Sequence, residues 1–234
     1  MLVVADDAIL SAIIAGQMGF PVGRINLLVK SAILHDIGAL KLQQLPDAED
    51  LDDGTKEVVK KNTQETLARY GDLDEEVLRL IAQMQELYTR ESDAEIPAGL
   101  KESVNANILY VADAYDRMTA MKSFEEPTSE VKAVRELLAD EERYNKKIVN
   151  ALIHGISILY PGVCVELSNG EKGLVITGNE ENIFEPTVLD FRNNNLYDLS
   201  DPSVKQTVEI ADVMKTMDNR IKLDKSLLEE YQAN

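Results

Sequence analysis

The sequence predicts a mainly α-helical protein in which a bundle of helices is followed by a small β module. Three observations support this prediction. Apolar residues recur at helical spacing as far as about residue 158. From Pro161 onward, short apolar segments with alternating polar residues flank asparagine-containing turns. With 234 residues, 44% of them hydrophobic, the chain can bury a sizeable core.

The helices are delimited by apolar stripes and by residues that break or cap a helix. A stripe containing Ile9, Ile13 and Met18 marks the first one, which Gly19 and Pro21 end. The expected helices cover residues 5–18, 24–37, 55–70, 72–88, 103–122, 127–139 and 145–158.

Two of these helices have a predicted N-terminal cap. Thr55 is expected to cap the helix that runs to Tyr70, after an acidic loop over residues 38–54. Asp72, with Glu75 three residues later, is an acidic variant of a capping box. The two helices are expected to pair across the short turn at Gly71.

The β module is expected to contain two hairpins. One joins residues 163–167 to 171–177 through an Asn-Gly turn, and the other joins 187–191 to 196–199 around an asparagine run. The strands suggest a small hairpin or barrel-like module, and residues 224–231 are expected to form a short C-terminal helix. The predicted domains are therefore residues 1–159 and 160–234.

Charge and cysteine content restrict the class of protein. Lys and Arg number 24 against 42 Asp and Glu, and the formal net charge of −18 repels polyphosphate backbones and anionic membrane surfaces. We therefore expect neither nucleic-acid binding nor membrane association. One cysteine, Cys164, excludes an internal disulfide, and no membrane span is visible, so we expect a cytoplasmic protein.

His35 and Asp36 are candidate metal ligands at the end of an apolar helical run. An imidazole nitrogen and a carboxylate oxygen both suit divalent metals. Because neighbouring helix residues diverge by about 100°, the pair can reach one ion only near a helix end, where Gly38 lets the backbone turn. The alternative is a helix-terminal histidine beside a solvated aspartate. Asp113 and Asp116 share one face of the later helix 103–122.

Four motifs in order resemble the HD superfamily, specifically its HD-GYP branch. They are His35-Asp-Ile-Gly38, Pro97-Ala-Gly-Leu100, the segment 111–120 and the glycine-containing segment that starts at Tyr160. The resemblance covers residues 5 to 160 and implies an HD-domain helical bundle that acts in bacterial signal transduction as a metal-dependent cyclic di-GMP phosphodiesterase. It also implies His35, Asp36 and Asp113 as metal ligands, with Mn, Fe or Mg as the metal.

The chain departs from that family at several ligand positions. Histidines of active members align with about Val3, with Asn62 and with Met84-Gln85, while Glu86 keeps the family's glutamate and Ala39 replaces a lysine. Only two histidines are present, and the second, His154, is expected to be a core or capping residue. Further residues proposed to support the site are Asp116, Asn62, Glu86, Lys41 and Arg117.

Three functions follow from this pattern. The first is a catalytically impaired HD-GYP-type protein that regulates by binding a nucleotide second messenger, a protein or a second copy of itself. In this case no metal need bind, and His35 and Asp113 could form a buried ion pair. The second is an active phosphohydrolase with a reduced His-Asp-Asp metal site. The third is a protein whose β module makes the contact with a partner.

Overall fold

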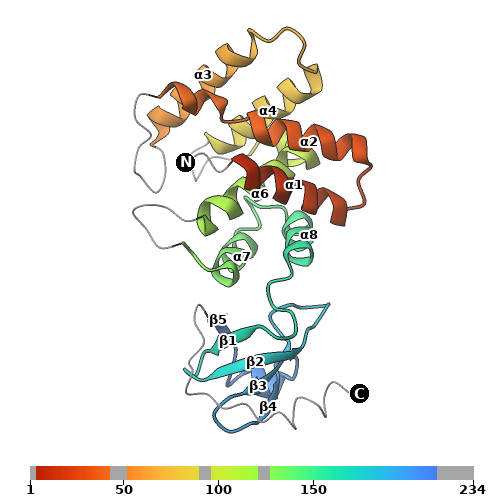
Figure 1. Ribbon diagram of the computed structural model, residues 1–234, viewed down its shortest axis with the longest axis vertical. Coiled ribbons are helices and arrows are strands. Elements are labelled where there is room, and N and C mark those ends of the chain that lie inside the picture. Colours follow the sequence, from red (N-terminus) through yellow and green to blue (C-terminus); the bar gives the residue numbers. More distant parts are fainter. Residues whose placement is uncertain (1–3, 43–51, 90–95, 121–126, 215–234) are drawn as a thin grey trace. The chain divides into compact units, whose positions relative to one another are not determined.

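The computed structural model describes residues 4–42, 52–89, 96–120 and 127–214. These residues fall into two compact units, a helical unit within 1–128 and 133–156 and a β unit within 129–132 and 157–234 (Figure 1). Among the helices described, none has the length and apolar character needed to cross a membrane.

The helical unit is built from short and medium helices with one 3-10 turn, η1. In chain order it contains α1 (Val4–Gln17), α2 (Val22–Leu34), η1 (Ile37–Lys41), α3 (Asp53–Leu67), α4 (Glu75–Tyr88), α5 (Ala98–Lys101), α6 (Val104–Thr119), most of α7 (Glu130–Ala139) and α8 (Lys146–Ile156).

Helix α6 forms the centre of this unit. Every residue from Ala106 to Asp116 is buried, so this helix is surrounded on all sides. It contacts α1, α2, α4 and α8, and α1 also packs on α2 and α8 (Figure 1). Polar side chains on α6, such as Asp113, are therefore placed inside the unit rather than on its surface.

Helix α2 ends earlier than the sequence predicts. Its last residue is Leu34, and His35 is its C-cap with helical φ and ψ of −63° and −29°. Asp36 leaves the helix with φ −115° and ψ 13°, and η1 begins at the next residue. The predicted helix to residue 37 was wrong at this end, and the expected loop begins instead with a 3-10 turn. The His-Asp pair therefore lies at a helix end.

Gly38 explains why the chain turns here. Its N–H donates to the Thr63 hydroxyl of α3 at 3.0 Å. A Cβ at this position would clash with the Val59 carbonyl oxygen and the Thr63 backbone nitrogen. Only glycine lets η1 approach the α3 backbone so closely, and this contact fixes the segment that follows the His-Asp pair.

Both predicted helix caps were wrong by a few residues. The carboxylate of Asp52 caps α3 by accepting from the Thr55 N–H at 2.8 Å. Asp74 caps α4 by accepting from the Glu76 N–H at 2.9 Å. In each case an aspartate in an extended or near-extended conformation just before the helix satisfies an otherwise unpaired amide.

Other predicted boundaries shift by a few residues. Helix α6 ends at Thr119 rather than at residue 122, and α7 begins at Glu130 rather than at residue 127. His154 is exposed in the last turn of α8, so it is not a core histidine. The predicted C-terminal helix, residues 224–231, lies outside the described residues.

The β unit contains one antiparallel sheet with the strand order β4-β3-β2-β1-β5. Both predicted hairpins are present. The sequence did not predict β5 and α9, because they contain too few residues to show a clear period. The elements are β1 (Cys164–Leu167), β2 (Lys172–Thr177), β3 (Thr187–Asp190), β4 (Leu196–Asp198), α9 (Pro202–Lys205) and β5 (Ile210–Val213).

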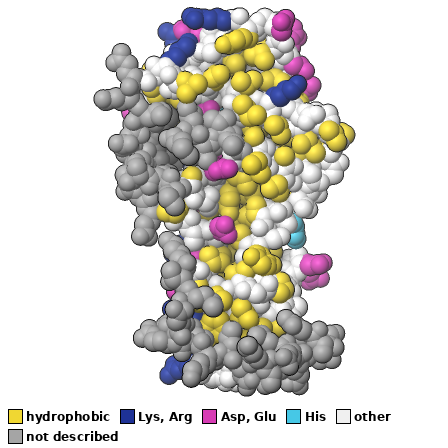
Figure 2. Space-filling model, in the orientation of Figure 1, with side chains coloured by type: hydrophobic (Ala, Val, Ile, Leu, Met, Phe, Trp, Pro, Cys, Tyr) yellow, Lys and Arg dark blue, Asp and Glu magenta, His cyan; other side chains and the backbone are white. Residues whose placement is uncertain are grey.

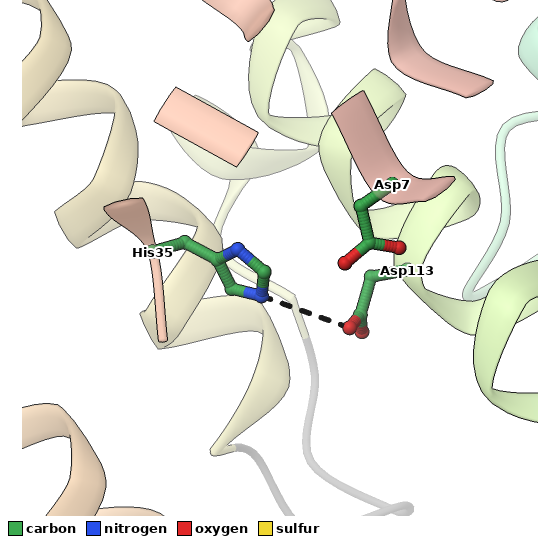
Figure 3. A group of neighbouring side chains, drawn as sticks. All are labelled: Asp7, His35 and Asp113. Atoms are coloured by element: carbon green, nitrogen blue, oxygen red, sulfur yellow. Dashed lines mark ion pairs between the residues drawn. The ribbon is translucent and has the colours of Figure 1, made fainter. Parts of the chain in front are cut away.

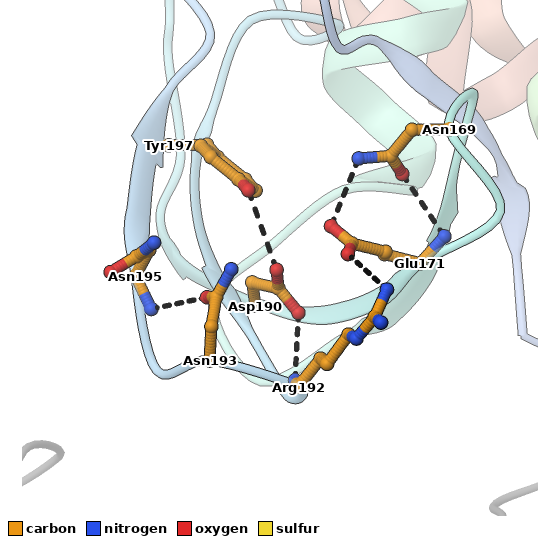
Figure 4. A network of polar contacts seen from close by, with 7 residues as sticks. All are labelled: Asn169, Glu171, Asp190, Arg192, Asn193, Asn195 and Tyr197. Atoms are coloured by element: carbon orange, nitrogen blue, oxygen red, sulfur yellow. Dashed lines mark hydrogen bonds and ion pairs between the residues drawn. The ribbon is translucent and has the colours of Figure 1, made fainter.

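A polar network connects the two hairpins (Figure 4). The buried Asp190 accepts hydrogen bonds from the Arg192 N–H at 2.7 Å and from the Tyr197 hydroxyl at 3.4 Å. Glu171, across the β2–β3 pair, accepts from Arg192 at 3.2 Å and from Asn169 at 2.9 Å. The polar side chains at the turns of these two hairpins therefore have structural roles.

Large hydrophobic side chains also reach the surface of the helical unit. Figure 2 shows hydrophobic groups gathered on its visible face. Over the helical unit as a whole, six of the described large side chains are between 47% and 71% exposed, namely Ile9, Val22, Ile33, Leu40, Val58 and Tyr70. Association with a protein partner, for which the sequence suggests the β module, or with a second copy stays a prediction.

Candidate metal centre

His35 is positioned by its place at the end of α2. Its Nδ1 lies 2.7 Å from the carbonyl oxygen of Ala32, one turn earlier in the helix. The Gln85 side chain of α4 donates to the His35 carbonyl oxygen at 2.7 Å and fixes the backbone. With Nδ1 directed at a carbonyl, Nε2 is the nitrogen available to a metal.

Asp113 approaches His35 from α6. Its Oδ1 lies 3.7 Å from His35 Nε2, as the dashed line in Figure 3 marks. Its Oδ2 lies 2.9 Å from Nη2 of Arg117, one helical turn later. The side chains of His35 and Asp113 are only 10% and 9% exposed, so this charged pair is largely removed from water.

Asp7 of α1 completes the group, and sequence reasoning missed it. Figure 3 shows its carboxylate directed toward Asp113 and His35. One ligand atom from each of these three residues lies within 4.8 Å of the others. Within the described residues, Asp7 Oδ1 is buried and has no hydrogen-bond partner.

The buried face of α1 that carries Asp7 is known from the structure, and it differs from the apolar stripe of Ile9, Ile13 and Met18 that the sequence predicted. Asp7, Ser11 and Ile14 are spaced by four and three residues, so they share one face of α1, and all three are buried. An aspartate on the buried stripe of a helix needs a partner. The family alignment had instead placed the first ligand near Val3, which lies outside the described residues.

Burial and mutual charge set the protonation of the group. Burial, followed by the charge of Asp113, raises the pKa of Asp7 to about 8. Burial alone would lower the pKa of His35, but the hydrogen bond and charge of Asp113 outweigh it and raise that pKa to about 9. For Asp113, burial is opposed by Arg117 and His35, which lower its pKa. The metal-free group therefore holds protons on Asp7 and His35 at neutral pH.

Asp36 and Asp116 lie near this group but are not among the three residues that converge within 4.8 Å. Asp36 Oδ1 is buried and has no hydrogen-bond partner among the described residues. The pKa of Asp36 is raised above its ordinary value, because the effect of burial is larger than the opposing effect of the His35 charge. Burial, with the charges of Asp6 and Asp113, raises the pKa of Asp116 to about 6.

The remaining predicted accessory residues have other contacts. The Asn62 amide nitrogen lies 3.4 Å from the Gly38 carbonyl oxygen. Lys41 pairs with Glu65 at 3.9 Å, and Glu86 is exposed on α4. Arg117 alone of the four has a described ion pair with the group, through Asp113.

The positions that the resemblance aligns with further family histidines are occupied by side chains with other contacts. Met84 is 1% exposed in the core of the helical unit. Gln85 supports the His35 backbone, and Asn62 contacts the backbone at Gly38. These three side chains are committed to packing or hydrogen bonding, so the described ligand atoms suit one metal ion better than two.

Comparison with known families matches residues 8–118 to the HD domain. This chain contains an HD domain. The match covers just under half of the chain and includes His35, Asp36 and Asp113, while Asp7 lies one residue before it. No curated protein matches the chain. HD domains typically bind divalent metals, and the HD domain suggests the metal-dependent phosphohydrolase superfamily.

The donor set fits such a metal. Asp7 and Asp113 offer carboxylate oxygens and His35 offers an imidazole nitrogen, a combination that binds Mn, Fe or Mg. The unsatisfied buried oxygens of Asp7 and Asp36, within the part of the chain that is described, are costly unless something binds them. A cation held among Asp7, His35 and Asp113 would satisfy the buried oxygen of Asp7.

Proposed function

We propose that the protein is a metal-dependent phosphohydrolase whose divalent ion is held by Asp7, His35 and Asp113. The observation that supports this most is the convergence of these three side chains from α1, α2 and α6 on one buried point. Asp36 is the proposed fourth ligand, because its buried Oδ1 has no hydrogen-bond partner among the described residues.

A divalent ion bound there would lower the pKa of a water molecule and polarise a phosphoryl oxygen. The protein's own residues prepare the site. The contact of His35 Nδ1 with the Ala32 carbonyl selects the tautomer whose Nε2 lacks a proton once the imidazole is neutral. Arg117 holds Asp113 ionised and fixes the direction of its carboxylate. Asp116, with its pKa near 6, is a candidate for exchanging a proton with substrate.

A second candidate function is a regulatory protein that binds a metal or a nucleotide without turnover. It is favoured by the replacement of family histidines by Asn62, Met84 and Gln85, which leaves one imidazole in the group. The HD-GYP assignment, cyclic di-GMP as the ligand and catalytic impairment stay predictions within this alternative.

The first experiment compares metal content and affinity in wild type and Asp7→Asn. The amide cannot supply the negative charge that Asp7 contributes as a ligand, so we expect Mn²⁺ binding to weaken at least about tenfold. Elemental analysis of protein purified without chelator and Mn²⁺ titration are the measurements. Asp6→Asn is the matched control, since Asp6 is exposed on the same helical turn and should leave metal binding unchanged.

Turnover then separates the two candidate functions. Wild type loaded with Mn²⁺ should hydrolyse a generic chromogenic phosphodiester or phosphomonoester, and His35→Ala should lose that activity. Metal bound at one equivalent without any turnover would support the regulatory protein. Equal metal content in wild type and Asp7→Asn would refute the proposed ligand set.

A further inference from the structure

Arg117 connects the metal group to an aromatic side chain on another helix. Its Nη2 lies 2.9 Å from Asp113 Oδ2. Its guanidinium carbon also lies 4.5 Å from the centroid of the Tyr88 ring, at the end of α4. The Arg117 side chain is 32% exposed, so it lies between the buried carboxylates and solvent.

Two lysines of α3 approach the same end of α4. Lys56 Nζ lies 5.4 Å from the centroid of the Tyr88 ring. Lys60, one turn later, places its Nζ 3.4 Å from the hydroxyl oxygen of Thr89 and 3.3 Å from Glu57. Cations from α3 and α6 therefore meet around Tyr88 in a chain whose net charge is −18.

A purely structural role would account for part of this arrangement. The carboxyl end of α4 carries a partial negative charge that attracts lysines, and Arg117 neutralises Asp113 while the metal is absent. Once a divalent ion shares Asp113, however, the ion supplies that neutralisation. Arg117 then contributes positive charge beside the ion, with the planar donor geometry that suits phosphate oxygens.

We propose that Arg117 and Lys56, held around the ring of Tyr88, form an anion-binding subsite beside the metal group and bind a phosphoryl group of the substrate. This inference rests on the proposed phosphohydrolase function and assigns residues to its substrate. The aspartates around the ion would repel a phosphate ester, and the subsite supplies the local positive charge that offsets them.

The test measures binding of inorganic phosphate to the full chain by titration calorimetry, with and without Mn²⁺. The variants are Lys56→Gln and Arg117→Gln, with Arg117→Lys as a charge-preserving variant. Lys61→Gln is the matched control, because it removes the same charge from an exposed position on the same helix. Metal content is determined for each protein in parallel.

We expect Lys56→Gln to weaken phosphate binding about tenfold with its metal content unchanged, which corresponds to one charge-assisted contact. Its phosphate affinity should also depend less on salt concentration than that of wild type. Arg117→Gln should weaken binding by at least as much, Arg117→Lys should recover part of the loss, and Lys61→Gln should bind like wild type.

The two proposals fail in different ways. Phosphate binding that is the same in wild type, Lys56→Gln and Arg117→Gln, with metal content intact, would overturn the subsite, as would a wild type that binds no phosphate. A wild type that takes up no metal would overturn the proposed function. Phosphate binding that is nevertheless lost in Lys56→Gln, but not in Lys61→Gln, would still support the subsite.

Discussion

Asp7 and His35 each hold a proton in the metal-free protein over a pH range where the same side chains in water would not. Burial, then the charge of Asp113, raises the pKa of Asp7 from 3.8 to about 8. Burial alone would lower the pKa of His35, but Asp113 raises it from 6.5 to about 9. For each residue, the folded protein binds more protons than the unfolded chain at pH values between the ordinary pKa and the raised pKa. The stability of the protein therefore depends on pH.

The sign of that dependence is the same for both residues. Each pKa is higher in the folded state, so each contribution is present at low pH and is lost as pH rises, for Asp7 between about 4 and 8 and for His35 between 6.5 and about 9. Urea unfolding of chelator-treated protein should therefore show stability falling from pH 6.5 to 9.

Asp7→Asn provides the control for this prediction. Because asparagine does not titrate, the decrease in stability with pH should be smaller in this variant, whereas Asp6→Asn should keep the wild-type slope. Stability that is constant or rises over this range would contradict the assigned protonation of the group.

At the scale of elements, the junction between α2 and η1 sets the direction of the His-Asp pair. η1 packs directly on α3 because Gly38 has no side chain, and Gly38 also donates to Thr63. Gly155 of α8 packs closely against the Ile13 side chain of α1. Close contacts at glycine thus hold α1, which carries Asp7, and the η1 segment that follows the His-Asp pair.

Gly38→Ala should destabilise the protein by more than about 2 kcal/mol, because the new Cβ would meet backbone atoms of Val59 and Thr63 that cannot move independently of α3. Thermal unfolding would measure the effect, and Mn²⁺ affinity should fall with it as His35 shifts. Gly23→Ala in α2 is the control, since a Cβ there meets nothing within 4 Å. That variant should change stability by about 1 kcal/mol or less.

At the scale of the whole molecule, the candidate metal ligands all belong to the helical unit, while the network of Asp190 and Glu171 belongs to the β unit. The β unit has its own buried side chains, including Val165, Val188 and Ile210. Damage to its network should therefore leave metal binding intact.

Asp190→Ala tests this separation. Loss of the buried carboxylate leaves the Arg192 N–H and the Tyr197 hydroxyl without their acceptor, and should cost about 2 kcal/mol. Denaturant unfolding would measure the loss, and elemental analysis should give wild-type metal content. Asp198→Ala, at an exposed position that accepts from Ser200, should cost less. A parallel loss of metal in Asp190→Ala would show that the two units are coupled.

Local sequence patterns determined much of this protein. The period of apolar residues gave the helices of the first part, and alternation with Asn-Gly turns gave the two hairpins of the second. The motif at residues 35–38 indicated a candidate metal site, because its features depend on neighbours a few residues apart, whereas Asp113 was added as a ligand only by the resemblance to the HD superfamily.

Only the tertiary structure brought Asp7 to His35 and Asp113, turned the chain into η1 and paired β5 with β1. These features depend on contacts between segments that lie tens of residues apart, and no local period records which segments will meet. Both the burial of Asp7 and its partners were decided by the packing of α1 against α6.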